Sequence, residues 1–70
     1  MKYKFYFGSE LLGRFELPIK ALDIKSKTYK IGSKHYEVVD GHYDVTTGGY
    51  SLNVEEIRFQ SVVDCNSYEV

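Results

Sequence analysis

Side chains able to bind a metal ion gather in one short segment of this 70-residue chain. Asp40, His42 and Asp44 alternate along the sequence, so they share one side if the segment is a straight strand, and His35 lies nearby. Imidazole and carboxylate groups are competent ligands for Zn²⁺ or Mn²⁺. The spacing matches no established ligand pattern, however, and a turn within the segment would break the alignment. We therefore expect solvated surface residues here, with no bound metal and no cofactor.

Enzymatic chemistry has little support in the sequence. Cys65 is the only cysteine, and only His35 and His42 offer an imidazole as a general base. We find no nucleophile elbow, phosphate-binding loop or pair of carboxylates in a marked context. We expect a binding module with no catalytic residues.

Basic residues form a candidate contact surface. Between residues 20 and 34 the chain has several lysines and only Asp23 as an acidic residue. Such lysines can hold phosphates while tyrosine rings stack on bases. The residues that we expect to contact a partner or ligand are Lys25, Lys27, Lys30, Lys34, His35 and Tyr6. Nucleic acid is disfavoured, because most tyrosines fall on the predicted core face and the acidic second half of the chain would repel a nucleic-acid backbone.

Charge is unevenly divided along the chain, although the net charge is only −1. Residues 1–35 hold eight lysines and arginines against three acidic residues, whereas residues 36–70 hold seven acidic residues against Arg58 alone. The two halves are therefore about +5 and −6. Either they neutralise each other within the monomer, or their opposite fields favour self-association or an oriented partner.

Two-residue turn signals recur at a spacing of eight, at Gly32-Ser33, Asp40-Gly41 and Gly48-Gly49. Tight hairpin turns need positive φ, which glycine supplies and aspartate tolerates. The pattern predicts four strands, at residues 28–31, 34–39, 42–47 and from 50 onward. In an alternative interpretation, residues 34–45 form one long strand that bends at Gly41, as in small SH3-like barrels.

The strand register favours the four-strand interpretation. A tight turn at Asp40-Gly41 followed by one at Gly48-Gly49 sets Val45 opposite Leu52. The three turns together place these apolar residues on one face: Tyr29, Ile31, Tyr36, Val38, Tyr43, Val45, Tyr50, Leu52 and Val54. A slip of one residue would turn every side chain over, so this agreement predicts a buried face.

Both ends of the chain add further elements. At the N-terminal end, alternating aromatic residues from Tyr3 to Phe7 and a second alternating run at residues 12–17 predict another hairpin, packed over the apolar face. Pro18 ends that strand, and the residues after it suit one short helical turn near residues 18–23. Near the other end, the apolar pattern changes parity before Ile57, which predicts a bulge at Glu55-Glu56 and an extended last strand.

These observations predict one small all-β domain over residues 1–70, an antiparallel meander closing into an SH3-like barrel or a curled sheet. A single cysteine, no secretory segment and no stretch of about 20 apolar residues lead us to expect a cytoplasmic protein without a membrane segment. A chain this short has a small core, and an exposed sheet edge can add burial through pairing.

We therefore expect a non-enzymatic module that acts by protein–protein contact, including contact with itself as a homo-oligomer. Compact β proteins of this size are common among accessory proteins of phages and mobile elements, which often bind host components. The alternative is a homo-oligomer that captures a small anionic ligand, such as a nucleotide, at its subunit junctions.

Overall fold

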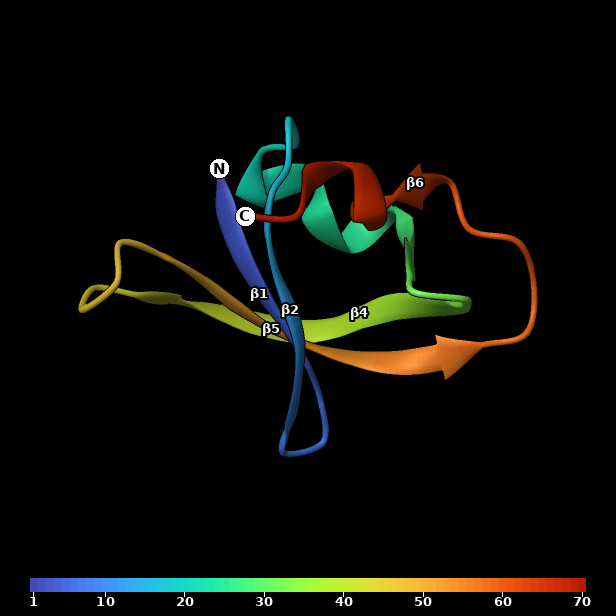
Figure 1. The fold of residues 1–70 in the computed structure, drawn as a ribbon. Helices are drawn as coiled ribbons and strands as arrows, with labels where there is room; N and C mark the ends of the chain where they lie inside the picture. Colours follow the sequence, from blue (N-terminus) through green and yellow to red (C-terminus); the bar gives the residue numbers. More distant parts are fainter.

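Six strands form one curled sheet in the computed structural model, which describes residues 1–70 (Figure 1). The strands are β1 (Lys2–Phe7), β2 (Glu10–Glu16), β3 (Thr28–Ile31), β4 (Lys34–Asp44), β5 (Gly49–Ile57) and β6 (Val63–Asp64). Two short 3₁₀ helices, η1 (Ala21–Ser26) and η2 (Cys65–Tyr68), complete the chain. The strand order is β2-β1-β5-β4-β3-β6, with parallel pairing of β1 to β5 and of β3 to β6. The expected all-β fold with a curled sheet is confirmed, and its short helical turn lies at Ala21–Ser26.

The N-terminal hairpin forms as its alternating aromatic residues predict. Gly8, with a φ of +62°, turns the chain between β1 and β2. The side chains of Tyr3 and Phe5 enter the core, while β1 joins the main sheet beside β5. Because the sheet is strongly curled, Phe5 meets Tyr29 on β3 with their ring centroids 5.2 Å apart.

The predicted tight turn at Asp40-Gly41 is wrong. β4 runs without interruption from Lys34 to Asp44, and Gly41 is not among the glycines with positive φ. The register passes from Val38 opposite Val54 to Asp40 opposite Asn53, so Val39 is an extra, bulged residue. The bent-strand alternative describes this segment correctly.

The bulge reassigns the inward-facing residues of the second half of β4. The pairing of Tyr29 with Tyr36 across the Gly32-Ser33 turn is confirmed, and the next turn lies at residues 45–48. Tyr43 is now opposite Tyr50, and Gly41 is opposite Leu52. Among the predicted core residues, Tyr29, Tyr36, Val38, Leu52 and Val54 are buried. Tyr43 and Val45, by contrast, are 51% and 82% exposed. They lie at the end of β4 and in the turn that follows it, beyond the core.

The predicted bulge at Glu55-Glu56 and the extended last strand are also wrong. The register continues evenly from Val54 to Ile57, and the chain then leaves the sheet. Residues 58–62 form a loop that leads to β6, which pairs with β3. The parity change arises because Ile57, opposite His35, is buried on the side where this loop returns.

The C-terminal segment contacts the outer edge of β2. The Val70 N–H donates to the carbonyl oxygen of Arg14 at 3.1 Å, and Glu69 forms a β-bridge with Phe15. The core beneath contains the fully buried side chains Tyr3, Tyr29, Phe5, Leu17 and Cys65. Neither 3₁₀ helix approaches the length and apolar character that a membrane-crossing helix needs.

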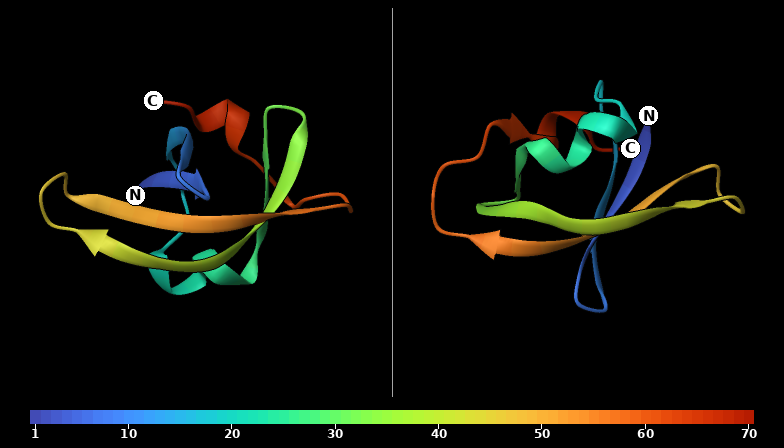
Figure 2. Two further views of the ribbon diagram at one scale, coloured as in Figure 1. Left: turned by 90° about the horizontal axis from the view of Figure 1, so that it is seen from below. Right: turned by 180° about the vertical axis from the view of Figure 1, so that it is seen from behind.

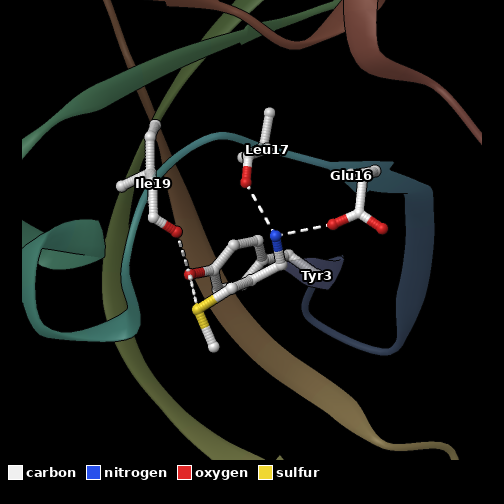
Figure 3. A network of polar contacts seen from close by, with 5 residues as sticks. Tyr3, Glu16, Leu17 and Ile19 are labelled. Carbon is white, nitrogen blue, oxygen red and sulfur yellow. Dashed lines mark hydrogen bonds and ion pairs between the residues drawn. The ribbon is translucent and has the colours of Figure 1, made fainter.

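Buried tyrosine hydroxyls find partners on the chain between β2 and β3. Tyr3 donates to the carbonyl oxygen of Ile19 at 2.6 Å (Figure 3), and Tyr29 donates to that of Ile24 at the same distance. An unpaired buried hydroxyl is costly, so these bonds fix the path of η1 over the core.

Candidate functional site

The lysines predicted to contact a ligand are spread over several elements. Lys25 lies in η1, and Lys27 is the first residue after η1. Lys30 on β3 is opposite His35 on β4, so these two residues are neighbours as a hairpin requires. Lys34, at the start of β4, lies 4.0 Å from a carboxylate oxygen of Glu56.

Tyr6 and Lys27 lie apart from the neighbouring pair Lys30 and His35. Tyr6 on β1 is opposite Leu11 and Asn53, in the part of the sheet formed by β1, β2 and β5. Lys27 borders a separate hollow of about 350 Å³, which is also lined by Pro18, Val62 and Tyr68. The structure therefore does not bring the six predicted contact residues into one site.

The candidate metal ligands on β4 are engaged in other contacts. Asn53 Nδ2 donates to Asp40 Oδ1 at 2.7 Å. The Thr46 N–H donates to Asp44 at 2.9 Å, and this bond, with the nearby Lys4, lowers the pKa of the Asp44 carboxyl. No three His, Cys, Asp or Glu side chains lie close enough together to hold a metal ion.

His35 and Ser61 form the one contact between an imidazole and a hydroxyl nucleophile. The Ser61 N–H donates to His35 Nδ1 at 3.3 Å, and Ser61 Oγ lies 2.8 Å from the same nitrogen. No carboxylate orients the ring from its other nitrogen. Neither residue lines the hollow beside Lys27 or the hollow beside Lys2 and Lys4. The pair therefore holds the 58–62 loop against the start of β4.

Cys65 is unsuited to nucleophilic chemistry. Its side chain is fully buried, and burial raises the pKa of the thiol to about 12, with a smaller contribution from the charge of Asp64. The reactive form of cysteine is the thiolate, which this environment suppresses.

The outer part of β4 presents an unpaired sheet edge. β3 pairs with residues 34–37 only, so beyond Glu37 this side of β4 has no strand partner. Figure 2 shows η1 along the middle of β4, on the side away from β5, while the end of the β4–β5 hairpin projects past the other elements. The exposed side chains of Tyr43 and Val45 lie at this projecting end.

A basic groove lies over β1, β2 and the start of β5. We define it by Lys2, Lys4 and Arg14, which line a hollow of about 400 Å³ together with Thr47 and Gly49. The sequence analysis missed this groove. Its signal is the alternation of Lys2 and Lys4 in a strand whose hairpin partner carries Arg14.

Ion pairs connect the two oppositely charged halves of the chain within the monomer. Lys4 Nζ lies 3.8 Å from Asp44 Oδ2, and the Lys34–Glu56 contact joins the halves at the other end of β4. Both separations are long for an ion pair, and the groups are partly exposed, so each contributes little to stability. The charge division is thus only partly neutralised internally. No family model, no curated protein and no solved structure matches this chain.

Proposed function

We propose that this chain is a non-enzymatic binding module that contacts a protein by strand addition at the unpaired edge of β4. The observation that carries the proposal is the extent of β4, of which β3 covers only residues 34–37. Free N–H and C=O groups on such an edge pair readily with an extended segment of another chain.

The backbone at the end of β4 has the alternation that strand addition needs. The carbonyl oxygen of Asp44 accepts from the Gly48 N–H at 2.9 Å, which directs the backbone groups of Asp44 toward the turn and β5. Alternate residues of an antiparallel strand face opposite sides, so Tyr43 directs its N–H and C=O outward. The ring of Tyr43 stays in place because it packs edge-on against Tyr50, with the ring centroids 5.0 Å apart.

Charge at this edge favours a basic partner segment. Asp40 and Asp44 lie within the unpaired stretch, and Glu37 precedes it. Two copies of β4 paired antiparallel to each other would bring these acidic residues together, and like charges placed opposite are unfavourable. A second copy of the chain is still a candidate partner through a different segment, since Lys25 and Lys27 form no ion pair.

Two substitutions at one position test strand addition. Tyr43→Pro removes both the ring and the outward N–H, whereas Tyr43→Ala removes the ring only. Random peptides displayed on phage are selected against the wild-type protein, and we expect basic peptides of high β propensity. Their binding should fall much further in the proline variant than in the alanine variant. Equal binding to the two variants would reject a backbone-mediated contact.

Sedimentation tests whether the partner is the chain itself. If a basic segment of one copy pairs with the acidic edge of another, the mass should rise above 8.1 kDa with concentration at low salt. High salt should reverse the rise, because it screens exposed charges. A mass of 8.1 kDa under both conditions would exclude self-association and leave a different protein as the partner.

A further inference from the structure

We infer that the basic groove is a binding site for a small phosphorylated ligand. The groove lies over β1, β2 and the 45–48 turn and does not include the unpaired edge of β4. This inference is therefore independent of the proposed strand addition, and each can be tested without the other.

The strand register places the three cations together. Lys4 on β1 is directly opposite Arg14 on β2, and Lys2 precedes Lys4 by two residues, so all three side chains share one face. The residues between and beside them, Tyr3 and Phe15, turn inward and are only 1% and 2% exposed. The floor of the groove is consequently a well-packed part of the core.

The positive charge of the groove is largely unneutralised. Glu16 is opposite Lys2, but its Oε2 lies 2.6 Å from the α-amino nitrogen of Met1 (Figure 3), so Lys2 forms no ion pair. Arg14 forms none either, and Lys4 has only the long contact with Asp44. Val70 also lines the groove.

This set of groups suits a phosphate. An arginine guanidinium binds phosphate oxygens in a bidentate manner, and lysines add point charges that can adjust to the remaining oxygens. Thr47 also lines the groove, but its side chain hydrogen-bonds the Asp44 carboxylate, so the phosphate contacts come from the three cations. A hollow of about 400 Å³ falls in the range of small-molecule sites.

The surroundings limit the size of the ligand. Asp44 is opposite Gly49, which lines the groove, and Asp40 follows on the same face of β4. These carboxylates would repel a polyanion that extended across the sheet toward β4. A ligand of at most mononucleotide size avoids them, so we assign the groove to small phosphate esters and not to nucleic acid.

Titration with defined phosphates tests the assignment. The probes are inorganic phosphate, pyrophosphate, adenosine monophosphate and a ten-residue oligothymidylate, added to ¹⁵N-labelled protein and followed by NMR and calorimetry. We expect saturable binding of the small phosphates, with amide shifts confined to the residues that line the groove. Absence of binding at millimolar concentrations, or shifts centred elsewhere, would overturn the inference. Tighter binding of the oligonucleotide than of the mononucleotide would overturn the size limit.

A charge-matched control separates a site from general attraction. Lys4→Gln with Arg14→Gln should weaken binding of adenosine monophosphate by roughly tenfold or more, because it removes two charge-assisted contacts. Lys25→Gln with Lys27→Gln changes the net charge equally but lies outside the groove, and it should leave the affinity within about twofold. If the variant with both Lys4→Gln and Arg14→Gln fails to fold, the single variant Lys2→Gln, on the exposed face of β1, replaces it in the test. Equal losses for groove and control variants would show that no site exists.

Discussion

Gly41 lies directly beneath the side chain of Leu52 on the neighbouring strand. A Cβ atom at Gly41 would come within 2.6 Å of Leu52 Cδ2 and 3.1 Å of the carbonyl oxygen of Ser51. The backbone of Gly41 is not in the left-handed region, so glycine is required here by close packing and not by conformation.

Gly41→Ala should therefore destabilise the protein by about 1–3 kcal/mol, the range typical of overpacked sites. His42→Ala, at the next and exposed position, should have little effect on the free energy of unfolding. The cost of Gly41→Ala should shrink in a Leu52→Ala background, where the clashing carbon is gone. Urea unfolding of the wild type, Gly41→Ala, Leu52→Ala and the double variant gives the coupling free energy between the two positions. Strictly additive effects would show that Leu52 is not the source of the strain.

Two valines on either side of the bulge should respond differently to truncation. Val38 is 7% exposed and packs in the core, whereas Val45 is 82% exposed in the turn. Val38→Ala should cost on the order of 1–3 kcal/mol through lost burial and a residual cavity. Val45→Ala should stay within about 0.5 kcal/mol. Thermal unfolding measures both, and a larger loss at Val45 would favour the tight turn at Asp40-Gly41 over the continuous strand.

Glu37 and Glu55 are directly opposite each other on β4 and β5. Like charges in this relationship are unfavourable, so Glu55→Lys should stabilise the fold by about 0.2–1 kcal/mol at low salt. The gain should decrease as salt screens the pair. Glu10→Lys, which makes the same charge change opposite Phe7, is the control. A gain of equal size in the control would trace the effect to net charge alone.

The difference between prediction and structure at β4 has a local cause. A turn at Asp40-Gly41 and a bulge before Gly41 both use glycine next to a small polar residue, so the residue types do not distinguish them. The bulge absorbs one residue at Val39, and this changes which later side chains face inward. Tyr43 and Val45, which the alternation of the sequence assigned to the core, are therefore exposed. The turn at Gly32-Ser33 was predictable because positive φ is required at Gly32. The predicted two-residue turn at Gly48-Gly49 is wrong: Gly48 does have positive φ, but the turn covers residues 45–48, and Gly49 belongs to β5 opposite Asp44.

The candidate sites were less predictable than the strands for a related reason. The β1–β2 hairpin predicts that Lys2, Lys4 and Arg14 share a face, but only the parallel pairing of β1 with β5 brings Thr47 and Gly49 beside them. Parallel pairs join segments far apart in the sequence, and no turn signal marks them. The unpaired edge likewise depends on the short length of β3 relative to β4.

Stability at high pH should report the buried thiol of Cys65. Burial raises its pKa from 9.0 to about 12, whereas the unfolded chain keeps the ordinary value. Below pH 9.0 both states hold the proton; from there to about 12 only the folded state does, so stability should fall by at most about 1.4 kcal/mol per pH unit. Cys65→Ala should reduce this slope in urea unfolding between pH 8 and 11. Burial also raises the pKa of Tyr29, with a smaller contribution from the charge of Cys65, so the difference in slope reports the thiol together with its effect on Tyr29. Identical slopes would contradict a protonated, buried Cys65.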